Sequence, residues 1–400
     1  MDKDIERETR LIHLLSDMVS IPSINPGDGP LQDLHGEQSM ADYLCQYFRN
    51  HPFTLDVAQE EILPNRPNVY IKTGRDPMKK TLLLETHTDT VRVDEMTIAP
   101  FTACVKDGKL YGRGSCDAKG QLAAMICGLE MALEETNGNL PINVHVAATV
   151  DEEHLHRGVD RLVDMKVEAD GAVAGEPTEL KVVAATKGSI RFKIVTTGES
   201  VHSANPQDGI NAIYIMSDII QTIHKHIVPM LRERNHTLCG KATMSVTTIQ
   251  GGTQVNIVPD RCVIDVDRRL LPGEHWEEAY LEIKQAIMEN IDGAFHPYVS
   301  IEYPYLIDPS LETDRHSPIV RSMTDTMSKL GEDSDMYGVP FGTDASKIAM
   351  RHIPTIVFGP GSISQAHTKD EFIEISEVLK AAEIYKTLIL HFHTYFREEE

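Results

Sequence analysis

Four mainly apolar segments of this chain each lead to a side chain that can bind a metal ion. Segments 81–86, 142–150 and 169–175 run directly into such groups, and 353–358 reaches one after a Gly-rich loop. Helical patterns lie between these segments, so the order predicts an α/β fold with a mixed, mostly parallel sheet flanked by helices. The carboxyl ends of parallel strands open into the crevice where ligands bind. We therefore predict a site at that edge of the sheet.

The groups at the segment ends are imidazoles and carboxylates, which are ordinary ligands of zinc. The candidates are His87, Asp89, Asp117, Glu152, Glu153, Glu176 and His367. This set is too large for one zinc ion, and it suits two metal ions that share a bridging carboxylate. One carboxylate must then stay off the metals as a general base. The adjacent Glu152 and Glu153 can supply one ligand and one base, because neighbouring side chains point in different directions.

Single residues of this set also have ordinary structural explanations. His87 with Asp89 could be a hydrogen-bonded strand end, and Asp117 could be the N-cap of the helix predicted over 121–135. Gly112 and Gly114 could suggest a phosphate loop, but the segment lacks the spacing of a P-loop and does not fit a dinucleotide fingerprint. Because all seven candidates meet at predicted strand ends, we favour metal chemistry.

The middle of the chain has a different order of elements. Strands and helices are predicted in the order strand, helix, strand, strand, helix, strand, at 190–196, 210–232, 242–250, 254–267, 275–291 and 298–303. This is the βαββαβ order of a ferredoxin-like module. Since the fourth metal-capable segment follows it, the module is an insertion. We predict a catalytic metal-binding domain over 1–186 and 308–400, with an inserted lid or dimerisation domain over 187–307.

The composition limits the kinds of partner that the chain is expected to bind. The formal net charge of -23 argues against nucleic acid and anionic membrane surfaces. No apolar run is long enough to span a membrane, and the N-terminal segment lacks the apolar core of a signal peptide. The six cysteines have no Cys-x-x-Cys spacing and indicate reduced thiols of a cytoplasmic protein. Cys116 could be a reactive thiol, but we favour a packed one.

A series of short motifs extends over nearly the whole chain. They are Ser20–Pro26, His87–Asp89, Gly112–Gly120, Asp151–Glu153, Gly175–Thr178, His202–Ala204, Asn256–Pro259, Asp267–Gly273, Gly342–Ala345, Gly359–Ser362 and Gln365–His367. In this order they resemble the acetylornithine deacetylase and succinyl-diaminopimelate desuccinylase family of dinuclear metallohydrolases, which also includes carboxypeptidase G and aminoacylase. The resemblance implies two divalent ions per chain, Zn²⁺ or Co²⁺.

The resemblance also implies the ligand arrangement. Asp117 would bridge the two ions. His87 and Glu176 would complete one metal site, and Glu153 and His367 would complete the other.

Further positions would take part in catalysis. Asp89 would orient His87. Glu152 would be the general base that takes a proton from the attacking water and passes it to the leaving amine. His202 would act in the active site of the partner subunit of a homodimer, in which inserted domains pair edge to edge. The alternative for His202 is a cap of the helix that follows it.

The remaining matched positions would bind the substrate. Asn256 and Arg269 of the inserted domain would hold its carboxylate, and Gly342 and Thr343 would line the same pocket. One departure concerns the segment His154–Arg157, because the family usually has small or apolar residues after the Glu pair. His154 could be an extra ligand, although we favour a solvated loop.

These features predict a cytoplasmic two-metal amidohydrolase that removes the acyl group from an N-acyl amino acid. A metallo-dipeptidase or carboxypeptidase would use the same site and stays open as an alternative. A non-catalytic α/β binding protein would be favoured by a missing ligand or base, and here all are present.

Overall fold

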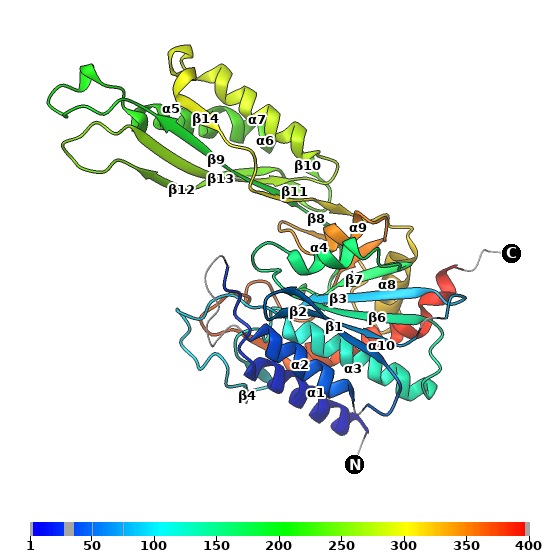
Figure 1. The fold of residues 1–400 in the computed structure, drawn as a ribbon. Coiled ribbons are helices and arrows are strands. Elements are labelled where there is room, and N and C mark those ends of the chain that lie inside the picture. Colours follow the sequence, from blue (N-terminus) through cyan, green and yellow to red (C-terminus); the bar gives the residue numbers. More distant parts are fainter. Residues whose placement is uncertain (1–2, 28–35, 50, 75, 397–400) are drawn as a thin grey trace. The chain divides into compact units, whose positions relative to one another are not determined.

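The computed structural model describes residues 3–27, 36–49, 51–74 and 76–396 (Figure 1). It divides into two compact units. One contains Met1–Ala184, Thr313–Tyr337 and Thr343–Glu400, and the other contains Ala185–Glu312 and Gly338–Gly342. The predicted junctions follow residues 186 and 307. The observed ones follow residues 184 and 312, and the segment Gly338–Gly342 also belongs to the second unit.

The first unit is built on a mixed sheet. Its strands are β1 (Asp56–Leu63), β2 (Arg66–Lys72), β3 (Thr81–His87), β6 (Asn143–Thr149), β7 (Gly171–Ala174), β8 (Val182–Thr186), β16 (Leu311–Glu312), β17 (Met336–Val339) and β18 (Thr355–Val357). Their order is β1-β2-β6-β3-β7-β18-β8-β16, with β17 beside β8. The central strands β6, β3, β7 and β18 are parallel, while the flanking strands are antiparallel. The predicted mostly parallel sheet is therefore confirmed.

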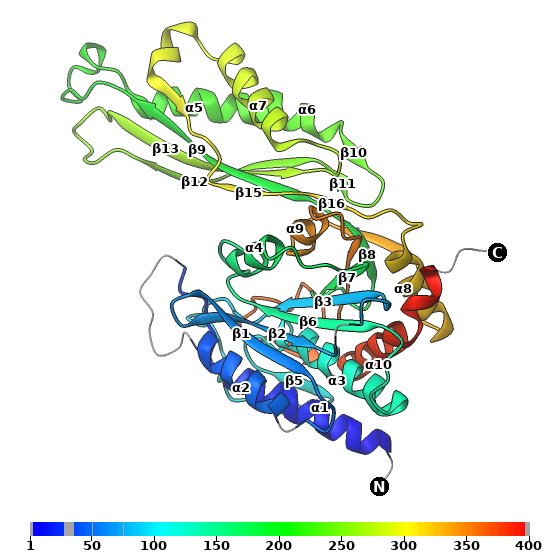
Figure 2. The same ribbon diagram turned by 45° about the vertical axis from the view of Figure 1, so that its right-hand side comes forward.

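Helices cover both faces of the central strands (Figures 1 and 2). On one face lie α1 (Lys3–Ser20), α2 (Glu37–Arg49), α3 (Lys119–Thr136), α8 (Pro318–Lys329) and α10 (Ile375–His391), and on the other lie α4 (Arg157–Asp164) and α9 (Ala345–Ala349). Leu82 and Leu84 of β3 belong to the first core and Leu83 to the second. Because both faces are buried, Leu82, Leu83 and Leu84 form a continuous apolar run instead of alternating with polar residues.

A small sheet lies beside the candidate site. It contains β4 (Cys104–Lys106), β5 (Lys109–Tyr111) and β19 (Phe372–Glu374), in the order β19-β5-β4. β5 leads into the loop that carries Asp117, and β19 follows the loop that carries His367. Pairing of β5 with β19 therefore joins two distant parts of the chain that each supply a candidate ligand.

The second unit has the predicted ferredoxin-like order. Its elements are β9 (Gly188–Thr197), α5 (Ala212–Thr222), a π-helical turn (Ile223–Ile227), α6 (Val228–Arg232), the hairpin β10 (Asn235–His236) and β11 (Gly240–Lys241), β12 (Thr243–Gly251), β13 (Arg261–Leu270), α7 (Trp276–Asn290), β14 (Val299–Ile301) and β15 (Leu306–Asp308). The antiparallel sheet runs β12-β13-β9-β14, with β15 also beside β9. Its core joins the inner face of these strands to α5 and α7.

One predicted strand of this unit begins later than expected. The strand predicted over 254–267 starts at Arg261. The preceding segment is a loop in which Gly252 has a φ of 78° and Val255 is fully exposed. Among the described residues of both units, no helix is long and apolar enough to cross a membrane.

Candidate metal centre

Strand ends bring most of the candidate ligands together. His87 is the last residue of β3, Glu176 lies two residues beyond β7, and Glu153 lies on the turn after β6. These three strands are parallel neighbours, so their carboxyl ends meet at one edge of the sheet. Asp117 immediately precedes Ala118, the N-cap residue of α3, and His367 follows the loop after β18.

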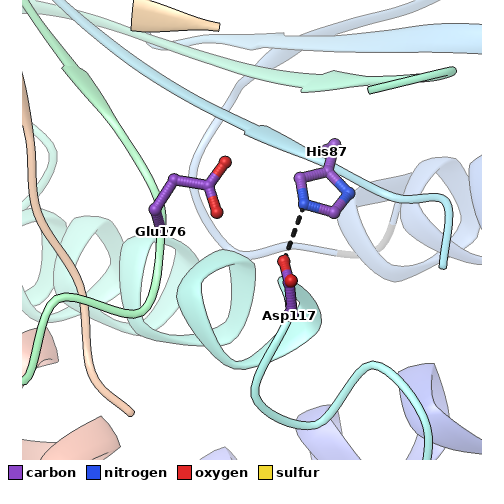
Figure 3. A group of neighbouring side chains, drawn as sticks. All are labelled: His87, Asp117 and Glu176. Atoms are coloured by element: carbon purple, nitrogen blue, oxygen red, sulfur yellow. Dashed lines mark hydrogen bonds and ion pairs between the residues drawn. The ribbon is translucent and has the colours of Figure 1, made fainter. Parts of the chain in front are cut away.

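The first ligand group contains His87, Asp117 and Glu176 (Figure 3). One donor atom from each side chain lies within 4.8 Å of the others, and all three residues are buried. His87 Nε2 is 3.0 Å from Asp117 Oδ1. The Glu176 carboxylate points toward this pair from the end of the neighbouring strand.

The second ligand group contains Asp117, Glu153 and His367. His367 Nε2 lies 3.3 Å from Asp117 Oδ2 and 3.1 Å from Glu153 Oε1. Asp117 therefore presents one oxygen to each group, which is the arrangement expected of a bridging carboxylate. The alternative that Asp117 caps α3 is wrong, because Ala118 is the N-cap residue and no side chain caps the helix.

The carboxylates of the two groups are buried close to one another. Burial, followed by the charges of Asp117 and Glu152, raises the pKa of Glu176. Burial also raises the pKa of Glu153. The hydrogen bond from His367 lowers this pKa, and the charge of Asp117 raises it further. Carboxylates crowded in this way are stable as anions only beside cations. Two imidazoles and three carboxylates form a donor set that zinc accepts.

Glu152 lies next to the ligand groups but belongs to neither. It forms a third group with His156 and Asp344. Burial raises the pKa of Glu152 to about 8. The charges of His156 and His87 act to lower this pKa, and those of Asp344 and Glu153 act to raise it. A carboxylate with a pKa near neutrality can both accept and return a proton.

Asp89 connects β3 to the turn that carries the two glutamates. His87 Nδ1 is 2.9 Å from the backbone oxygen of Asp89 and 3.6 Å from its carboxylate. The same carboxylate accepts hydrogen bonds from the backbone N–H groups of Glu152 and Glu153, each at 3.1 Å, and from the Asn25 amide at 2.7 Å. Asp89 therefore contacts His87 mainly through its main chain and holds the glutamate turn through its side chain.

Glu371 is a buried carboxylate that the sequence analysis missed. It pairs with Arg113 at 2.7 Å and accepts hydrogen bonds from the backbone N–H groups of Gly114, Cys116 and Asp117. These contacts fix the loop that presents Asp117. The partners lie more than 250 residues apart, so no local pattern indicated them. Cys116 is fully buried, as expected of a packed thiol.

A cleft of about 600 Å³ opens beside the second ligand group. Its walls include Asn25, Arg92, His154, His367 and Lys369. Among the described residues, His154 belongs to no group of three potential ligands, so it is a wall residue of this cleft. A larger groove of about 780 Å³ lies at the opposite, amino ends of β3 and β6 and contains none of the candidate ligands.

Four of the predicted functional residues lie in the second unit, namely His202, Asn256, Arg269 and Gly342. His202 and Asn256 are exposed on neighbouring loops, where Ser203 N–H donates to Asn256 O at 3.0 Å. Arg269 is partly exposed and pairs with Asp267 at 2.8 Å. The helix-cap alternative for His202 is wrong, because Asn211 accepts the first backbone N–H groups of α5.

Gly342 is the last residue of the second unit, and Thr343 is the residue at which the chain returns to the first unit. A Cβ atom at Gly342 would lie 1.8 Å from Asp308 Oδ2, so a larger residue there would displace the Asp308 carboxylate. Thr343 is 1% exposed, and its hydroxyl accepts a hydrogen bond from Ala345 N–H at the start of α9. The next residue, Asp344, is the one that contacts the Glu152 turn, through His156.

Comparison with known proteins identifies relatives along nearly the whole chain. The family model described as Peptidase family M20/M25/M40 matches residues 83–391. The chain is 30% identical over 391 residues to the acetylornithine deacetylase of Edwardsiella ictaluri and 31% identical over 393 residues to that of Yersinia pseudotuberculosis. Both alignments cover 95% of this chain and 97% of the relative.

Solved structures share the fold at lower identity. Aminopeptidase PepT from Bacillus cereus has a TM-score of 0.78 at 22% identity, covering 96% of this chain and 98% of that one. The M20 family metallo-carboxypeptidase of Sulfolobus solfataricus has a TM-score of 0.75 at 20% identity, with coverages of 98% and 100%. The resemblance found from the motifs is confirmed, and the chain belongs to the peptidase family M20/M25/M40.

Proposed function

We propose that this protein is a two-metal deacylase that hydrolyses the amide bond of an N-acyl amino acid, with N-acetylornithine as the first substrate to test. Membership of the peptidase family makes it a metal-dependent hydrolase of amides. The deacylase assignment is supported by full-length relatives named acetylornithine deacetylase. The observation that carries the mechanism is Asp117, which presents one carboxylate oxygen to each of two ligand groups.

The side chains fit two divalent ions. His87 and Glu176 would hold one, Glu153 and His367 would hold the other, and Asp117 would contact both. Zn²⁺ suits these imidazoles and carboxylates, and Co²⁺ accepts the same donors. When bound, a pair of such ions acidifies water and polarises the scissile carbonyl.

Glu152 would carry the proton. It lies outside both ligand groups, so its carboxylate stays available to take a proton from the attacking water and deliver it to the amine nitrogen that leaves. Asp89 would keep Glu152 in register with the ligands, because its carboxylate holds the backbone N–H groups of both Glu152 and Glu153.

Substrate contacts from the second unit complete the proposal. Asn256 and Arg269 would hold the substrate carboxylate, since an amide and a guanidinium both donate to carboxylate oxygens. Gly342 and Thr343 would shape the same pocket. His202 would donate to the carbonyl oxygen, where negative charge develops during attack.

We further propose a homodimer in which His202 acts in the partner's site. β12 lies at an edge of the second sheet and is mostly exposed. Exposed sheet edges pair readily with another chain. Ile249 on β12, Tyr214 on α5 and Val255 in the following loop are exposed large apolar residues of this unit, which supports its role in association.

A cytoplasmic location is supported by the cysteines. All six are free thiols in the structure, and four of them are buried. Free thiols are typical of a reducing compartment.

The test is a hydrolysis screen with added Zn²⁺ or Co²⁺. Substrates are N-acetylornithine, other N-acetyl, N-succinyl and N-formyl amino acids, and dipeptides. The proposal expects N-acyl amino acids to be hydrolysed faster than dipeptides. Preference for dipeptides would favour the peptidase alternative. Absence of amide hydrolysis by the metal-loaded protein would overturn the proposal.

A further inference from the structure

We propose that His156, anchored by Asp344, is a positioning residue that holds the carboxylate of Glu152 in its working orientation. This inference rests on the proposed role of Glu152 as the general base. His156 lies in the segment that departs from the small or apolar residues expected after the glutamate pair. The structure turns its side chain toward the site.

The contacts of His156 are specific. Its Nδ1 atom is 2.9 Å from Asp344 Oδ1 and 3.8 Å from Glu152 Oε1. The side chains of His156 and Glu152 are each 14% exposed, and that of Asp344 is 3% exposed. One imidazole nitrogen therefore lies between a buried carboxylate that anchors it and the carboxylate that would carry the proton.

The charge of the ring favours this role. Burial alone would lower the pKa of His156, but the hydrogen bond to Asp344 and the charge of Glu152 raise it to about 9. At neutral pH the ring is then protonated and lies between the carboxyl groups of Asp344 and Glu152. Other charged groups near His156 and Asp344 are Lys347 on α9, Asp160 on α4 and Glu85 on β3.

The backbone of the turn sets the direction of the ring. His156 has a φ of 58° and a ψ of 25°, in the left-handed region that side-chain-bearing residues seldom occupy. Its N–H donates to Asp151 O at 2.7 Å, which closes the turn that carries the glutamate pair. This conformation directs the ring toward Glu152 and Asp344. In a solvated loop the ring would instead lie in water.

The consequence for Glu152 is a restricted side chain. Oε1 faces the cationic ring, which leaves Oε2 for proton transfer. Without this contact the Glu152 side chain would be free to take other rotamers, and small misplacements of a reacting group reduce the rate strongly. His156 does not touch the substrate in this scheme, and Asp344 positions Glu152 by anchoring the ring.

The experiment compares two substitutions that both accept the left-handed backbone. His156→Gly removes the ring, whereas His156→Asn places an amide nitrogen near the position of Nδ1. The control is His352→Gly, because His352 is exposed and has a φ of 60°. For each metal-loaded variant we would measure the metal content, and kcat and KM with the substrate found by the screen.

We expect kcat of His156→Gly to fall about 10- to 100-fold with metal content and KM unchanged. His156→Asn should recover most of this loss, and His352→Gly should behave as wild type. Asp344→Asn should lower kcat by itself and lower it much less in the His156→Gly background, because the ring that Asp344 anchors is then absent.

Three results would overturn the inference. These are an unchanged kcat in His156→Gly, a rise in KM alone, which would make His156 a substrate contact, and loss of metal from His156→Gly. Failure of the proposed function is distinguishable, because then the wild-type protein would not hydrolyse the amides at all.

Discussion

The carboxylate of Asp89 accepts a hydrogen bond from the backbone N–H of Glu153 at 3.1 Å, which joins the strand that carries His87 to the turn that carries a candidate ligand of the second group. Asp89→Asn replaces one acceptor oxygen by a donor, so one hydrogen bond to the glutamate turn is lost. Outer contacts of this kind commonly change metal affinity about 10- to 100-fold. We expect the variant to bind metal more weakly by that factor in a chelator competition. Asp107→Asn, on an exposed turn, is the control and should bind as wild type does.

Glu152→Gln should keep the metal ions and lose turnover. The amide has nearly the shape of the carboxylate but cannot take the proton, so kcat should fall about 10²- to 10⁴-fold. Metal analysis and steady-state kinetics on the same preparation check this. If Glu152→Gln instead loses metal while Glu153→Gln keeps it, the two residues exchange roles. The exposed Glu168→Gln is the matched control.

His202→Ala and Glu152→Gln should complement each other if His202 acts across a dimer. Each variant alone should be inactive or nearly so. Random subunit exchange makes half of the dimers mixed, and each mixed dimer has one complete site. About a quarter of wild-type specific activity is therefore expected. Exchange demonstrated by tagged subunits without recovery of activity, or a fully active monomer, would contradict the proposal.

Glu274 should control the acid stability of the second unit. It accepts hydrogen bonds from Arg234 and Arg268 at 2.8 Å and from Leu271 N–H at 2.7 Å. Burial works against ionisation, but these contacts lower the pKa of Glu274 below its ordinary value of 4.5. Its stabilisation is thus fully present above about pH 4.5 and is lost as the pH falls through the lower folded-state pKa.

Glu274→Gln leaves the fully buried Arg268 without its carboxylate partner. We expect a loss of about 3 kcal/mol in the free energy of unfolding at pH 7, measured by urea denaturation. The difference from wild type should shrink as the pH falls below 4. A constant difference between pH 7 and pH 3 would show that the charge of Glu274 is not its cause.

The candidate ligands could be proposed from the sequence because strand ends have a local signal. An apolar run that stops at a histidine or a carboxylate marks both the strand and its functional edge, as at His87 and Glu176. The residues that hold those ligands have no such signal. Asp344 contacts His156, and Glu371 contacts Asp117, across 188 and 254 residues of the chain. Only the fold makes them neighbours.

The second unit shows the same limit of local patterns. Val255 and Ile257 alternate as in a strand, yet Val255 is 101% exposed and the strand begins only at Arg261. The pair Arg268 and Arg269 looks equivalent in sequence. Successive residues of β13 face opposite sides of the sheet, so Arg268 is buried in the core and Arg269 is partly exposed.

The position of β18 has a consequence for synthesis of the chain. This strand, Thr355–Val357, lies between β7 and β8 in the sheet, although β7 precedes the second unit in sequence and β8 leads into it. During synthesis, the main sheet therefore lacks the strand between β7 and β8 until residues 355–357 have been made. Residues 185–312 by then already contain a core of their own. The second unit can fold first, and the first must wait for its final strand. His367 arrives later still, so a half-made chain lacks one member of the second ligand group.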